Sequence, residues 1–185
     1  ECNSPYKSYS TFGGNPYFVN LDLLLEEGLL TNEELSHAKQ GTPYFCEFDR
    51  LKAERVPLLI KAAQRADGAL KEKINEFINN NNQIKDFCVF MALKSANNEK
   101  EWTQWTTKEY DEQIYFGWCF IQYEFFSQWA RVKKYANENG ISIIGDIPIY
   151  VALDSSDVWS APSQFLLDKD GKPRFVAGVP PDYFS

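Results

Sequence analysis

Three aspartates follow a short apolar run in the stretch GDIPIYVALDSSDVW, which covers residues 145–159. Asp146 follows Ile-Ser-Ile-Ile at 141–144 after one glycine. That run reads as a short buried strand, and a carboxylate is rare in that setting unless it is paired. Its role is either to contact a polar ligand or to form a structural cap or ion pair, and position alone favours neither. Asp154 and Asp157 are expected to make turn and cap hydrogen bonds. The spacing of the acids is not that of an EF-hand.

Other reactive side chains are few. The one histidine, His37, lies in the polar helical stretch TNEELSHAKQG and is expected at the surface, and no G-x-S-x-G motif accompanies it. The four cysteines, Cys2, Cys46, Cys88 and Cys119, are scattered and form no C-x-x-C pair. No metal or other cofactor is therefore expected, and a reduced, cytoplasmic protein is predicted.

The composition argues against several kinds of partner. Hydrophobic residues make up 44% and charged residues 24%, which is typical of a globular chain. A net charge of −7 argues against nucleic acid. No apolar run approaches the roughly 20 residues that span a bilayer, so no membrane partner is expected. The aromatic content of 16% is high; most of these rings are expected in the core, but exposed Tyr and Trp faces also suit sugar rings.

Helical patterns occupy the first half of the chain. Residues 21–30, LDLLLEEGLL, predict a helix that stops at Gly28. Thr31 with Glu34 three residues later predicts a capping box, for a helix that runs to about Lys39.

A second helical pattern covers residues 56–78. Pro57 suits the first turn of this helix, and Gly68 is its weak point. The asparagine tract at 79–82 predicts a loop, and Asp86 is the expected N-cap of the next apolar helix.

The longest predicted helix covers about 108–137, and Gly140 is placed to end it. Its apolar face is formed by Ile114, Trp118, Ile121, Phe125, Trp129, Val132 and Ala136. A long helix, a glycine and a short apolar strand at 141–144 are half of a βαβ unit, which suggests a parallel sheet. Because ligands bind at the carboxyl ends of parallel strands, Asp146 lies where a site is expected.

Three stretches carry a resemblance to a known family: SPYKSYSTFGGNPYFVNLDLL at 4–24, GDIPIYVALDSSDVW, and VAGVPPDYFS at 176–185. Together they resemble the 4-α-glucanotransferases called amylomaltases or disproportionating enzymes, which are related to the α-amylases. The resemblance implies an α/β fold, an incomplete (β/α)8 TIM-type barrel with a helix-rich inserted subdomain, of which this sequence is the N-terminal part. It also implies transfer of an α-1,4-glucan segment to the 4-hydroxyl of an acceptor sugar, with maltooligosaccharides as substrates.

The same resemblance suggests a division of the chain. Residues 1–19 would be a substrate-side loop of the barrel, residues 20–107 a helical insertion, and residues 108–185 a barrel helix, strand and active-site loops. All three belong to one partial catalytic domain, which needs the remainder of the barrel.

The resemblance also assigns roles to residues. Asp146 matches the carboxylate of the first short amylase-type motif, which lies near the bound sugar but is not the nucleophile. Where α-amylases place a histidine five residues later, this sequence has Val151.

At the two ends of the sequence, Ser4 and Tyr6 match a segment that lines the acceptor side of the cleft. Asp182 matches an acid in a loop that closes over the glucan. Its neighbours Tyr183 and Phe184 are candidate contacts that help to exclude water, which competes with the acceptor sugar.

The reacting carboxyl groups of the family have no counterpart here. Retaining glycoside chemistry needs two carboxyl groups about 5–5.5 Å apart. The family supplies them from an R-x-D-H motif and a later E-D-L-G-type segment, and neither occurs in this sequence. No catalytic residue is therefore assigned, and the 185-residue chain is expected to be inactive alone. An α-glucan hydrolase and a non-catalytic carbohydrate-binding module remain as alternatives.

Overall fold

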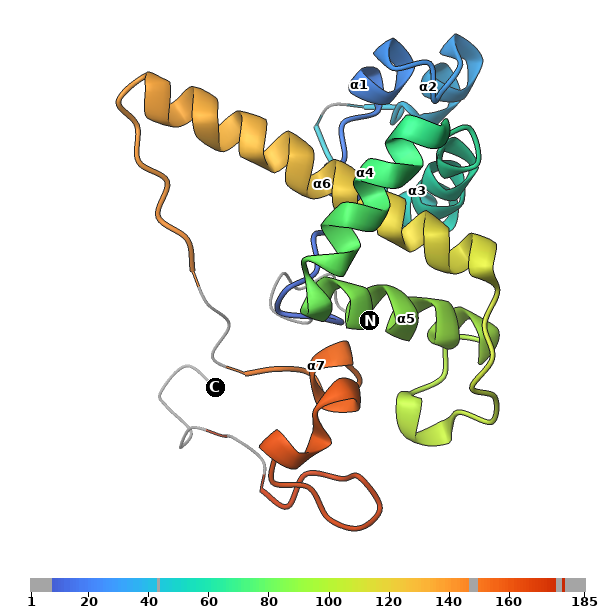
Figure 1. Cartoon of the computed structure of the whole chain (residues 1–185), viewed down its shortest axis with the longest axis vertical. Helices are drawn as coiled ribbons and strands as arrows, with labels where there is room; N and C mark the ends of the chain where they lie inside the picture. The colour runs from blue at the N-terminus through green and yellow to red at the C-terminus, as the bar shows by residue number, and fades with distance from the viewer. Residues whose placement is uncertain (1–7, 43, 147–149, 176–177, 179–185) are drawn as a thin grey trace.

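The computed structural model describes residues 8–42, 44–146, 150–175 and 178. Within these ranges the regular elements are helices, joined by loops (Figure 1). The α-helices are α1 (Leu21–Glu26), α2 (Asn32–Ala38), α3 (Phe48–Ala63), α4 (Gly68–Asn79), α5 (Asn82–Ala96), α6 (Glu112–Glu138) and α7 (Ser156–Ser160). Three 3-10 turns are η1 (Pro16–Phe18), η2 (Trp102–Gln104) and η3 (Pro162–Gln164). The β pairing among the described residues is an isolated antiparallel bridge between Leu167 and Pro173.

Local sequence signals place α1 and α2 as predicted. α1 is followed by Gly28, whose φ of 73° lies in the left-handed region that glycine adopts freely. The Thr31 hydroxyl accepts the Glu34 N–H at 3.2 Å, and the Glu34 carboxylate accepts the Thr31 N–H at 2.9 Å. The predicted capping box is thus confirmed, and it fixes the start of α2.

The predicted helix over 56–78 is in fact two helices. α3 begins eight residues earlier than expected, so Pro57 lies inside it and its predicted first-turn position is wrong. An ion pair of 3.0 Å between Arg50 and Glu54, one turn apart, supports those early turns. The break comes just before Gly68, where the Asp67 carboxylate accepts the Leu70 N–H at 2.8 Å and starts α4.

The boundary between α4 and α5 is tighter than the asparagine tract suggested. Asn81 donates its side-chain N–H to the carbonyl of Phe77 at 2.7 Å, which satisfies the end of α4. α5 then begins at Asn82, so Asp86 lies in its second turn and the prediction that Asp86 caps the helix is wrong.

The long helix α6 organises the core. Its first half packs across α3, α4 and α5, where Trp118, Phe120 and Ile121 are buried. Its second half projects beyond these neighbours (Figure 1), and its apolar face is exposed there, with Trp129 42% and Tyr135 71% accessible. The predicted apolar periodicity of α6 is therefore confirmed, but the core covers only its inner turns. In the described ranges, no helix combines the length and apolar character that crossing a bilayer requires.

The segment after α6 differs from its prediction. Gly140, with φ of 74°, ends the helix as expected. Residues 141–144, however, are irregular and exposed, with Ile144 94% accessible, so the predicted buried strand is wrong for this structure. A strand needs a neighbour to pair with and a surface to cover it, and the described residues supply neither at this place.

Candidate functional site

Two segments that are far apart in the sequence meet beside α5. The Ser156 N–H donates to the Tyr9 carbonyl at 2.8 Å. The Asp157 carboxylate accepts both the Thr11 hydroxyl at 2.7 Å and the Thr11 N–H at 3.0 Å. The N-terminal segment 8–12 and the loop 150–160 thus form one unit, although 146 residues separate Thr11 from Asp157.

A buried ion pair lies under this contact. Lys94, on α5, is 1% exposed, and its ammonium group donates to the Asp154 carboxylate at 2.6 Å. It also donates to the carbonyls of Glu99 at 3.2 Å and Lys100 at 3.1 Å. The ammonium group lies 4.9 Å from the centroid of the Tyr9 ring. One cation therefore contacts the turn that follows α5, the N-terminal segment and the later loop.

The loop around Asp154 is fixed by further hydrogen bonds. The second oxygen of Asp154 accepts the Trp102 N–H at 3.2 Å, and the Trp102 indole donates to the Leu153 carbonyl at 2.8 Å. The Ser155 hydroxyl donates to the Ala152 carbonyl at 2.6 Å and accepts the Val158 N–H at 3.3 Å, which caps α7.

Asp154 and Asp157 are hydrogen-bonded, as expected, but not as local turn and cap residues. Their partners, Lys94, Trp102 and Thr11, all come from distant segments.

Aromatic rings fill the space beneath the joined segments. Phe90 lies 5.2 Å from Trp105, 5.9 Å from Trp159 and 6.2 Å from Tyr9, measured between ring centroids. The rings are tilted against one another, and Phe90 is fully buried. These aromatics support the site from below.

The structure describes only part of the predicted site. Asp146 is exposed, at the end of the irregular segment that follows α6. Val151, where the α-amylases have histidine, is half-buried.

The remaining predicted site residues lie outside the described ranges. These are Ser4, Tyr6, Asp182, Tyr183 and Phe184.

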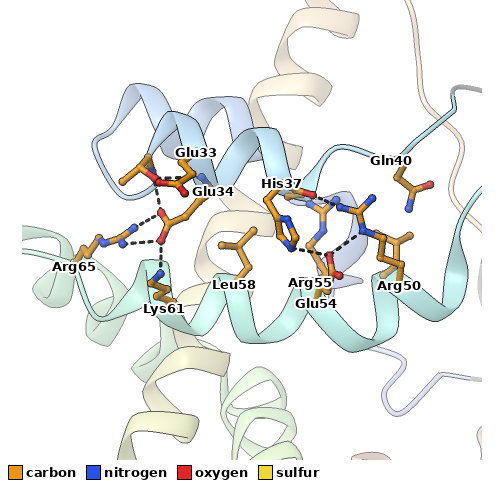
Figure 2. Close-up of a pocket in the computed structure, with 13 residues that line it drawn as sticks. Glu33, Glu34, His37, Gln40, Arg50, Glu54, Arg55, Leu58, Lys61 and Arg65 are labelled. Atoms are coloured by element: carbon orange, nitrogen blue, oxygen red, sulfur yellow. Dashed lines mark hydrogen bonds and ion pairs between the residues drawn. The ribbon is translucent and has the colours of Figure 1, made fainter.

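A separate hollow of about 540 Å³ lies between α2 and α3 (Figure 2). At one end Glu34 accepts from Arg65 at 2.7 Å and from Lys61 at 2.6 Å, and these bonds hold the pKa of Glu34 far below its usual range. At the other end His37 lies 3.8 Å from Glu54, with its side chain 76% exposed, so the predicted surface position of His37 is confirmed. At each end of the hollow, side chains of α2 pair with side chains in α3 or just after it. The main effect of these contacts is to hold α2 against α3.

The sequence Arg65-Ala66-Asp67 shares the Arg and the Asp of the R-x-D-H motif, but Gly68 replaces the histidine. Arg65 is paired with Glu34, and Asp67 caps α4. Neither side chain is available as a reacting group.

Two further groups were not anticipated from the sequence. Lys94 is the first, and its signal was a lone lysine in the apolar stretch FCVFMALKSA. Glu124 on α6 is the second: it is 4% exposed, and burial together with the Glu27 carboxylate raises its pKa to about 7. No group of His, Cys, Asp or Glu able to hold a metal ion occurs within the residues that the structure describes.

Comparison with known proteins identifies the family. The family model for 4-alpha-glucanotransferase matches residues 1–185, so the chain belongs to this family. The 4-alpha-glucanotransferase of Clostridium butyricum is 40% identical over 200 residues, which cover 99% of this chain and 41% of that protein. The 4-alpha-glucanotransferase of Aquifex aeolicus is 36% identical over 197 residues, covering 99% of this chain and 39% of that protein.

A solved structure is similar as well. The amylomaltase from Streptococcus agalactiae in complex with acarbose superposes with a TM-score of 0.90 at 34% identity, over 98% of this chain and 40% of that one. The helical arrangement described above is therefore that of the matching part of an amylomaltase. The chain spans about 40% of the length of these relatives.

Proposed function

We propose that the protein containing this sequence is a 4-α-glucanotransferase, which transfers a segment of an α-1,4-glucan to the 4-hydroxyl of an acceptor sugar. Family membership along the whole chain supports this assignment. The structural observation that carries it is that two family motifs, at 4–24 and 145–159, are in contact: Tyr9 accepts a hydrogen bond from Ser156, and Thr11 donates to Asp157. A glucan groove built from both motifs needs this contact.

In the proposed reaction, a nucleophilic carboxylate and an acid/base carboxyl group act from outside these 185 residues. This chain supplies the wall of the groove. Asp146 accepts hydrogen bonds from sugar hydroxyls, and Ser4 and Tyr6 line the acceptor side. Asp182, with Tyr183 and Phe184, closes over the glucan and excludes water.

We further propose that α6 and the segment after it belong to a (β/α)8 barrel. The outer apolar face of α6 and the exposed isoleucines at 141–144 are the kind of surface that neighbouring barrel strands and helices cover. In that setting residues 141–144 would pair as a parallel strand. The division into 1–19, 20–107 and 108–185 is part of the same proposal, and so is a cytoplasmic location.

Product analysis tests the function. Incubation of the full-length protein with maltotriose should give longer maltooligosaccharides together with shorter products. Glucose and maltose alone would instead identify an α-glucan hydrolase, in which water replaces the acceptor. The isolated 185-residue chain should leave maltotriose unchanged. If calorimetry shows that this chain alone binds maltohexaose and the full-length protein forms no products, a non-catalytic carbohydrate-binding module is the better assignment.

A further inference from the structure

We propose that the Lys94–Asp154 ion pair is a positioning device that sets the width of the glucan groove by holding the N-terminal segment and the 150–160 loop against α5. The inference rests on the proposed glucanotransferase function. It assigns a role in substrate binding to two residues that touch no sugar themselves.

The cost of burying the pair indicates that it does more than fill space. A lysine is almost never fully buried without a partner, because desolvation of its charge is unfavourable. Lys94 is nevertheless 1% exposed, in an α5 whose other core side chains, among them Phe90 and Leu93, are apolar. An apolar residue at this position would pack with less desolvation, and what it could not supply is a directed bond to Asp154.

The geometry shows which parts the pair joins. The ammonium group contacts the face of the Tyr9 ring at 4.9 Å and the Asp154 carboxylate at 2.6 Å. Tyr9 lies three residues after Tyr6, and Asp154 lies eight residues after Asp146. Lys94 is thus a common anchor for the two described segments that follow the proposed sugar contacts in the sequence.

Other contacts also hold these segments. The Thr11–Asp157 hydrogen bonds are solvent-exposed. The Ser156–Tyr9 hydrogen bond joins backbone to backbone and does not involve α5. Against α5 itself, the rings of Tyr9 and Trp159 pack on Phe90. After α5, Trp102 binds Asp154 and Leu153. Ring contacts are less directional than a charged hydrogen bond, so removing the ion pair should let both segments shift relative to α5 without unfolding the helices.

The test separates positioning from stability. Replacement of both residues in the double variant Lys94→Met/Asp154→Leu removes the charges together, and apolar replacements of a buried ion pair are often neutral for stability. The variant is made in the full-length protein, and kcat and KM are measured with maltotriose alongside the melting temperature. Arg65→Met is the control, because it breaks an ion pair of 2.7 Å between α2 and the turn that follows α3, far from both segments in the sequence.

We expect the double variant to raise KM for maltotriose about tenfold with a smaller change in kcat, since the affected residues bind sugar but do not react. The control should lower the melting temperature and leave KM unchanged. A wild-type KM in the double variant would overturn the inference while leaving the proposed function intact. Absence of any transfer by the wild-type protein would overturn both.

A second variant covers the case in which the double variant does not accumulate. Asp154→Asn keeps the volume and one acceptor oxygen but removes the negative charge. A KM raised about threefold or more supports positioning by the ion pair, and a KM equal to that of the wild type contradicts it.

Discussion

The side chain of Gln122, on α6, binds both backbone polar groups of Gly14. Its carbonyl oxygen accepts the Gly14 N–H at 2.7 Å, and its amide donates to the Gly14 carbonyl at 3.0 Å. Six residues further along α6, Gln128 binds Asn20 in the same way, at 2.7 Å and 3.5 Å. The loop before α1 is therefore attached to α6 at two points, one buried and one accessible to water.

Gln122→Leu should lower the free energy of unfolding by about 2–5 kcal/mol, because two buried backbone groups would lose their partners. Gln128→Leu is the comparison variant: water can replace its bonds to Asn20, so it should cost less than Gln122→Leu, although it also loses a 3.4 Å bond to the buried Glu124 carboxylate. Urea unfolding of the full-length protein, followed by tryptophan fluorescence, gives both values. Equal losses for the two variants would contradict the distinction between the buried and the accessible attachment.

Gly14→Ala should also be destabilising, because an added Cβ would overlap the ring of Phe125. We expect a loss of about 1–3 kcal/mol or more, typical of an overpacked core. Gly68→Ala is the control: a Cβ there meets nothing within 4 Å, and Gly68 is the first residue of α4. That change should be neutral or slightly stabilising, and thermal melts of the two variants should move in different directions.

Glu124 should make stability depend on pH. Its pKa is raised from the ordinary 4.5 to about 7 in the folded state, so the folded state binds more protons than the unfolded state between these two pH values. The free energy of unfolding should therefore fall by about 3 kcal/mol as pH rises from about 4 to about 8.

Glu124→Gln should remove this fall, so that the variant gains stability relative to wild type at pH 8. Chemical unfolding at a series of pH values measures the difference. Glu138→Gln, an exposed change of the same type on α6, serves as the control. A constant difference between wild type and Glu124→Gln across the series would refute the linkage.

Asp146→Asn in the full-length protein should lower kcat/KM for maltotriose about tenfold or more, since a charged hydrogen bond contributes about 1.5–3 kcal/mol. Stability should be unchanged, because Asp146 is exposed. Asp49→Asn, in the first turn of α3, is the control and should keep wild-type kinetics. Normal turnover by Asp146→Asn would return Asp146 to a structural role.

Features set by neighbouring residues were predictable from the sequence. The Thr31–Glu34 capping box and the helix end at Gly140 depend on contacts within a few positions, and both appear as expected. The long apolar repeat of α6 was equally clear. Lys94 was not predictable, because its partner Asp154 lies 60 positions away. The prediction of a strand at 141–144 was wrong for a related reason. A strand forms by pairing with a second segment, and the sequence pattern of one segment does not show whether the second is present.

The outer turns of α6 have a practical consequence for handling this polypeptide. Trp129, Val132 and Tyr135 expose indole, isopropyl and phenol groups to solvent on these outer turns. In a preparation of these 185 residues, the exposed apolar surfaces of different molecules would associate and promote aggregation as the protein concentration rises. Aggregation of this polypeptide would therefore reflect the exposed side chains of α6 and would not indicate that the helix is badly formed.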